Sequence, residues 1–82
     1  MKASIAVFKP SGYNDCTKIV DLLRDKTPVI MNLELIDDAS AIKILDFLTG
    51  ALFALNGGMD AITQDCFFLY PDSIEIKRFP GK

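Results

Sequence analysis

The run from Asp37 to Gly58, DDASAIKILDFLTGALFALNGG, is the longest apolar-periodic stretch in the chain. Asp37 can accept hydrogen bonds from the unpaired amides of a first helical turn. Asn56-Gly57-Gly58 offers residues that tolerate the left-handed conformation with which helices commonly stop. The run therefore predicts one long helix. At about 100° per residue, one wide apolar stripe suits a helix that covers a sheet, and it contains Ile44, Leu45, Leu48, Leu52 and Leu55.

A second apolar flank adjoins this stripe, and one sheet cannot bury both. Gly50, on this flank, is either a tolerated helical glycine, at a cost of about 1 kcal/mol relative to alanine, or a point of close approach by a second helix. A chain this small has few other surfaces that could hide the flank, so we favour the second interpretation and expect a two-fold homodimer. The expected interface consists of Phe47, Gly50, Ala51 and Ala54. Two further apolar residues, Ile42 and Phe53, lie outside it, further round the helix.

Length and composition indicate a single domain over residues 1–82, with an ordered part of about 4–79. Nine basic and eleven acidic residues give a net charge of −2, and the basic residues are scattered. We therefore expect no nucleic-acid partner, because such sites need clustered Lys and Arg. No apolar run reaches the roughly 18 residues of a membrane span, and no signal peptide is evident, so we expect a cytoplasmic domain.

The sequence also argues against catalytic and metal-binding chemistry. It contains no histidine, no nucleophile elbow and no phosphate-binding glycine loop. Asp37 and Asp38 suit a helix start better than a catalytic pair. Cys16 and Cys66 cannot form a disulfide framework, and we interpret both as unpaired, unreactive, small buried hydrophobes. We expect no enzyme activity, no cofactor and no metal.

The rest of the chain predicts strands around a first helix. Ser4–Phe8 reads as a strand that ends at Lys9-Pro10. Ser11 is expected to cap a helix that ends near Lys26, with its apolar positions at Cys16, Ile19, Val20 and Leu23. Val29–Leu33 is a continuous apolar run, which favours a strand covered on both faces or paired centrally. These pieces form a βαβ unit with parallel strands.

Three further strands are expected after the long helix. Residues 59–64 and Cys66–Tyr70 predict a hairpin, and Ile74 and Ile76 alternate with polar residues as in a half-exposed edge strand. Residues 79–82 are expected to leave the domain as a tail. The predicted fold is an α/β sandwich, βαβαβββ, with two helices stacked on one face of a mixed sheet.

Four motifs follow one another along the chain: KPSGYND (9–15), PVIMNL (28–33), ILDFLTGALFALNG (44–57) and FFLYP (67–71). In this order they resemble the C-terminal core domain of the SepF family, cytoplasmic cell-division proteins that link FtsZ filaments to the membrane. The resemblance covers about Ile5 to Ile76. Its most specific part is D-F-L-x-G-A followed by A-L-x-G.

This resemblance implies a non-enzymatic, homodimeric adaptor, with higher oligomers left open, that binds the C-terminal tail of FtsZ at the division site. Members reach the membrane through an N-terminal amphipathic helix. We expect no such helix in these 82 residues, so that they are either a core fragment of a longer protein or part of a version that reaches the membrane otherwise. An aromatic position of the tail site falls on Phe67, and a position that is basic in some members falls on Ala61. Attraction for an acidic tail would then come from Lys9 or Lys43, or the contact is mainly apolar. From its pattern alone, Phe67 is a core strand aromatic.

A second function remains open from the residues: a small-molecule-binding regulatory domain that dimerises around its ligand. Such a domain should contain an enclosed pocket with a few converging polar groups. An adaptor should instead contain a shallow apolar groove beside the hairpin.

Overall fold

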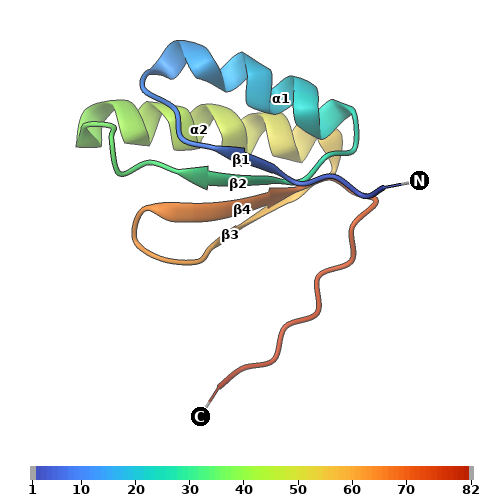
Figure 1. The fold of residues 1–82 in the computed structure, drawn as a ribbon. Helices are drawn as coiled ribbons and strands as arrows, with labels where there is room; N and C mark the ends of the chain where they lie inside the picture. Colours follow the sequence, from blue (N-terminus) through green and yellow to red (C-terminus); the bar gives the residue numbers. More distant parts are fainter. Residues whose placement is uncertain (1, 82) are drawn as a thin grey trace.

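A computed structural model describes residues 2–81 of the chain. Within them, four strands and two α-helices follow one another as β-α-β-α-β-β, with a 3₁₀ turn before the first helix. Both helices lie on one side of the sheet, and the C-terminal segment leaves on the other (Figure 1). The predicted α/β class with two helices stacked on one face is confirmed. The elements are β1 Ala6–Phe8, η1 Tyr13–Asp15, α1 Cys16–Arg24, β2 Val29–Asn32, α2 Asp38–Leu55, β3 Gly58–Ala61 and β4 Cys66–Tyr70.

The sheet has the order β1-β2-β4-β3, so β2 and β4 are its central strands. β1 and β2 are parallel, as a βαβ unit requires, whereas β4 is antiparallel to both of its neighbours. The predicted hairpin is therefore β3 and β4. The central position predicted for residues 29–33 is confirmed, since β2 pairs on both edges.

α2 begins and ends close to the predicted residues. The Asp37 side chain accepts a hydrogen bond from the Ser40 amide at 3.1 Å, and this bond lowers the pKa of the Asp37 carboxyl. Asn56 takes the left-handed conformation that ends the helix, with φ 60°. The Gly57 amide donates to the Leu52 carbonyl oxygen at 2.9 Å, which completes the predicted helix stop. Gly57 and Gly58 also have a second purpose. A Cβ on Gly57 would meet the Tyr70 carbonyl oxygen, and one on Gly58 would meet the Tyr70 ring, so both glycines permit close packing of β3 against β4.

The start of α1 differs from the prediction. Ser11 does not cap the helix; its amide donates to the Asp15 carboxylate at 3.1 Å. The 3₁₀ turn Tyr13–Asp15 follows Ser11, and α1 begins only at Cys16, with Asp15 at its N-cap and no side-chain cap. The helix stops near the predicted place, and Lys26 adopts a left-handed conformation with φ 66°.

The core lies between the two helices and the sheet, and both predicted helical stripes face it. Leu45, Leu55 and Val20 are half-buried against it. Alternate residues of the central strands β2 and β4 complete the core from the side of the sheet. The buried apolar residues are Cys16, Ile19, Leu23, Val29, Met31, Leu33, Ile44, Leu48, Leu52 and Leu69.

The predicted fifth strand at residues 74–77 is wrong. Its alternation is present, because Ile74 and Ile76 are half-buried while the residues between and after them are exposed. However, after buried Pro71 the chain turns and leaves on the open side of the sheet (Figure 1), and residues 74–77 pair with none of the four strands described. Alternation indicates a half-covered segment, but it does not supply a partner edge.

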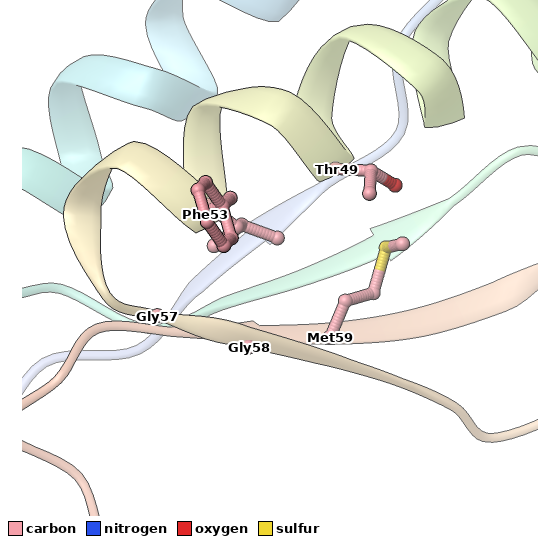
Figure 2. A pocket seen from close by; sticks show the side chains of 6 residues that line it. Thr49, Phe53, Gly57, Gly58 and Met59 are labelled. Carbon is pink, nitrogen blue, oxygen red and sulfur yellow. The ribbon is translucent and has the colours of Figure 1, made fainter.

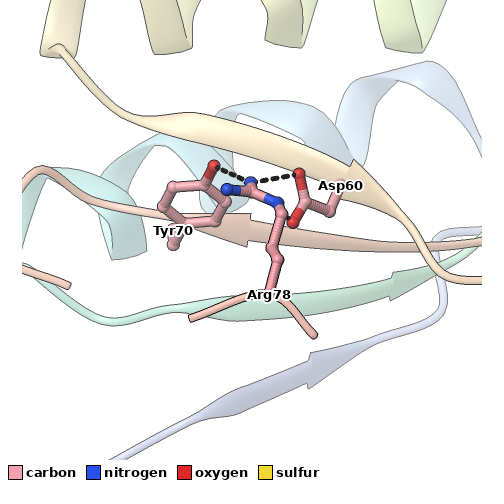
Figure 3. A network of polar contacts seen from close by, with 3 residues as sticks. All are labelled: Asp60, Tyr70 and Arg78. Atoms are coloured by element: carbon pink, nitrogen blue, oxygen red, sulfur yellow. Dashed lines mark hydrogen bonds and ion pairs between the residues drawn. The ribbon is translucent and has the colours of Figure 1, made fainter. Parts of the chain in front are cut away.

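Polar contacts fasten this C-terminal segment at both ends. Near its start, Lys26 donates to Asp72 at 2.7 Å, which lowers the pKa of the Asp72 carboxyl. Further along, one nitrogen of Arg78 lies 2.8 Å from each oxygen of Asp60 and 3.1 Å from the Tyr70 hydroxyl (Figure 3). These contacts hold Pro71–Arg78 against the sheet side that the helices leave open.

Candidate functional site

A row of cross-strand neighbours leads out of the core towards the hairpin. Phe8, Met31, Phe67 and Ala61 are successive partners in register across the four strands. Such partners share one face of a sheet, and here that face is the one under the helices. Met31 is fully buried, Phe67 is half-buried and Ala61 is exposed. The row therefore emerges from the core at the β3 edge of the sheet.

A hollow of about 290 Å³ lies where this row meets the N-terminal half of α2. Phe67 forms part of its lining and also packs against the core. One part of the ring is therefore a core aromatic, and another part is available to a ligand in the hollow. Ile42 on α2 is 60% exposed beside it. The lining consists of Leu33, Asp38, Ala41, Ile42, Leu45, Gln64, Asp65 and Phe67. Ala61 is adjacent in register to Phe67 but is not part of this lining.

A second hollow, of about 270 Å³, lies one to two turns further along α2. Figure 2 shows Met59 of β3 pointing up towards α2, below Thr49. The Phe53 ring is 84% exposed, and Gly57 and Gly58 line the hollow without side chains.

These two hollows lie on the same flank of α2, because Ile42, Leu45, Thr49 and Phe53 recur at spacings of three and four residues. We call the two hollows together the α2–hairpin groove. It is open to solvent and largely apolar. This form differs from the enclosed pocket with converging polar groups that a small-molecule site requires.

The charges near the groove are acidic. Asp38, in the first turn of α2, and Asp65, just before β4, both line its first hollow, whereas neither hollow has a basic residue in its lining. Lys9 forms an ion pair with Glu34 at 3.5 Å. Lys43 is exposed on α2 and lies outside the lining of both hollows.

The flank expected to form a dimer interface lies elsewhere on α2. Phe47 is 37% exposed and meets the Tyr13 ring edge-on, with 5.9 Å between ring centroids. Gly50 and Ala54 are exposed, and Ala51 is half-buried. A Cβ placed on Gly50 would have no other atom within 4 Å, so no neighbour within residues 2–81 requires this glycine.

Both cysteines are free, as predicted. Cys16 is buried, and burial raises the pKa of its thiol, with a smaller contribution from Asp15. Cys66 is only half-buried, because it lies at the start of β4 opposite Asn32.

Several groove residues were not predicted as a site. Ile42 and Phe53 were expected to be apolar groups outside the core stripe, and Asp38 was expected only to favour the helix start. Met59 and Asp65 carried no prediction of function. The spacing of Ile42, Leu45, Thr49 and Phe53 was available as a signal, because it defines a second helical stripe next to the buried one.

Neither helix within residues 2–81 combines the length and apolar character needed to cross a bilayer.

Comparison with protein families gives a match over residues 5–76 to the model described as cell division protein SepF. A cell division protein SepF from Frankia casuarinae is 40% identical over 72 residues, which are 88% of this chain and 40% of that protein. A SepF from Lactiplantibacillus plantarum is 37% identical over 76 residues, covering 93% of this chain and 54% of that protein. The chain thus spans about half or less of the length of these relatives.

Solved structures share the fold at lower sequence identity. A SepF-like protein from Archaeoglobus fulgidus superimposes with a TM-score of 0.87 at 20% identity, covering 98% of this chain and 99% of that one. The cell division protein SepF from Methanobrevibacter smithii, solved in complex with FtsZ-CTD, gives a TM-score of 0.73 at 15% identity, covering 93% and 99%. From the family match and the identity to these relatives, the chain belongs to the SepF family of non-enzymatic cell-division proteins.

Proposed function

We propose that this chain is the core domain of a cell-division adaptor and that its α2–hairpin groove binds the C-terminal tail of FtsZ. The observation that carries the proposal is the half-buried Phe67 ring at the floor of an open apolar groove, in a chain that belongs to the SepF family. The SepF of M. smithii, which shares the fold, was solved with FtsZ-CTD, and this supports a role in tail binding.

The groove suits a short extended peptide. From Ile42 to Phe53 it follows eleven residues of α2, about 16 Å at 1.5 Å per residue. An extended peptide of roughly five residues covers this length. Ile42 and Phe67 offer one apolar anchor site, and Phe53 and Met59 offer a second. Ala61, beside Phe67 on the edge strand, adds a small apolar contact at the margin.

The adaptor acts as a homodimer in this proposal. Phe47, Gly50, Ala51 and Ala54 lie on a flank of α2 separate from the groove, so a partner copy could occupy that flank while a tail occupies the groove. A Cβ placed on Gly50 would meet no atom within 4 Å other than those of its own helical neighbourhood, within residues 2–81. This open space supports close approach by another helix.

The proposed place of action is the cytoplasm at the division site, on the inner face of the cell membrane. Contact with the membrane is assigned to a segment of the adaptor that is not among these 82 residues. The core domain then supplies the FtsZ-binding half of the link.

Binding is tested by calorimetric titration with the C-terminal peptide of FtsZ from the same organism. We expect Phe67→Ala to weaken binding by about 2 kcal/mol, because a few buried anchors carry most of the energy of short-peptide contacts. Phe68→Ala is the matched control, since Phe68 is the next residue of β4, is also half-buried and faces the opposite side of the sheet. It should leave the affinity unchanged.

A second variant protects the test against loss of fold. Ile42 is exposed, so Ile42→Ala should weaken binding with little effect on thermal stability. Circular dichroism of all three variants establishes whether they are folded. If folded Phe67→Ala and Ile42→Ala bind as wild type does, the groove is not the site, and if wild type shows no binding at high peptide concentration, the adaptor function is wrong.

A further inference from the structure

The lining of the first hollow includes two acidic residues, one from α2 and one from the hairpin side. Asp38 projects from the first turn of α2, and Asp65 precedes β4 at the end of the hairpin turn. The ion pairs found within residues 2–81 engage Asp21, Glu34, Asp60 and Asp72, so neither groove carboxylate is paired there. Both are free to meet a ligand.

The backbone holds Asp65 in position. Its carbonyl oxygen accepts the Leu33 amide at 2.8 Å, and its own amide approaches the Thr63 hydroxyl at 3.4 Å. Asp38 is fixed by the helix that it begins. A bound ligand would therefore meet two acidic residues whose main chains need little reordering.

The positive end of the α2 dipole does not cancel this charge. A helix N-terminus is equivalent to roughly half a positive charge, whereas the first turn here carries the carboxylates of Asp37 and Asp38. The hydrogen bond from Ser40 lowers the pKa of the Asp37 carboxyl and so favours its charged form. The net charge at this end of the groove is therefore negative.

Within residues 2–81, the lining of this hollow contains no Lys or Arg that would offset the two carboxylates for a negatively charged ligand. Ala61 contributes a methyl group next to Phe67, Lys9 is engaged by Glu34, and Lys43 lies outside the groove lining. An acidic residue beside the apolar anchor would meet like charge. A Lys or Arg there would meet opposite charge from both acidic residues.

We infer that the groove selects peptides that carry a positive charge directly beside the apolar anchor and disfavours peptides that are acidic at that position. This inference rests on the proposed function, since it assigns the class of peptide that the same groove takes. The apolar floor supplies affinity, and Asp38 and Asp65 supply the discrimination by charge.

The test uses three versions of the FtsZ C-terminal peptide of the same organism, in which the residue flanking the apolar anchor is Lys, Gln or Glu. At low ionic strength, we expect the Lys peptide to bind roughly tenfold more tightly than the Glu peptide, with Gln between them. Exposed ion pairs contribute up to about fivefold each. Added salt should reduce the difference, because the groove is open to solvent.

The protein variants locate the charge effect. In the double variant Asp38→Asn with Asp65→Asn, the Lys and Glu peptides should bind within about twofold of one another. Asp46→Asn is the matched control, because Asp46 is an exposed carboxylate on α2 outside both hollows, and this variant should keep the wild-type order.

The possible failures can be distinguished. Equal binding of the three peptides to wild type, or tighter binding of the Glu peptide, overturns the charge inference while tail binding stands. An order that survives in the double variant also overturns it. If none of the three peptides binds, the proposed function fails together with the inference.

Discussion

The two faces of the sheet are covered in different ways. On the helix side, Val29, Met31 and Leu69 are completely buried under two amphipathic helices. On the other side, Val7 is 77% exposed, and Ile30 and Phe68 are only half-buried, although all three are apolar. The segment Pro71–Arg78 leaves the sheet on this second side (Figure 1), and ion pairs near its two ends tie it to the rest of the domain.

This difference separates two kinds of stabilisation. Apolar burial under the helices removes large areas from water and is worth about 25 cal/mol per Å². Exposed ion pairs, such as Lys26 with Asp72, are worth little each and are weakened by salt. The helix side should therefore determine the stability of the domain, whereas the open side should determine how firmly the C-terminal segment is held.

The largest expected effect is on the free energy of unfolding. It is tested at two neighbouring residues of β2 that face opposite sides of the sheet. Met31→Ala should lower the free energy of unfolding by about 2–5 kcal/mol, because it leaves a cavity in a close-packed core. Ile30→Ala should cost roughly 1 kcal/mol, because its site is already partly open to water. Urea denaturation measures both, and equal losses would mean that the open side is as well packed as the core.

A second expected effect concerns which apolar surface joins two copies. Gly50→Lys places a charged side chain on the proposed interface of α2, so sedimentation should show half the wild-type mass at the same concentration. Val7→Lys makes the same kind of change on the open face of β1 and should leave the dimer intact. The opposite outcome, dissociation by Val7→Lys alone, would move the interface to the open face.

The smallest expected effect tests the fastening of the C-terminal segment. Arg78→Ala removes the contacts to Asp60 and Tyr70, so the backbone order parameters of residues 75–79 should fall below about 0.6. The unfolding midpoint should hardly change. Arg24→Ala, which removes an exposed pair on α1, is the control. Order parameters that stay at the wild-type level would show that Ile74 and Ile76 hold the segment without Arg78.

The same two faces explain how much of the fold could be predicted from the sequence. Helix caps and apolar stripes depend on local spacing, so the bounds of α2 and its buried residues Ile44, Leu48 and Leu52 were predicted correctly. The alternation at Ile74 and Ile76 was also real, but pairing depends on where a free strand edge lies in space. The Ser11 cap was wrong because the 3₁₀ turn Tyr13–Asp15 comes between Ser11 and α1, so Asp15 and not Ser11 stands at the N-cap of the helix.

The candidate site was predictable in part. The choice of Phe67 as a contact residue came from the resemblance to the SepF family, because its pattern alone predicted a core strand aromatic. The two groove carboxylates could not be predicted, because Asp38 and Asp65 are far apart in sequence and meet only through the pairing of β4 between β2 and β3. The dimer flank at Gly50 and the contacts of Phe67 with a tail remain predictions.

The strand order has a consequence for synthesis of the chain on the ribosome. β4 is the last strand to be made, yet it joins β2 to β3; Val29, for example, pairs with Leu69. Until residues 66–70 emerge, β2 has a free central edge and β3 has no partner, so α2 has only half a sheet to cover. Such edges are where nascent chains aggregate. We therefore expect this domain to remain dependent on ribosome-associated chaperones until its final strand is released.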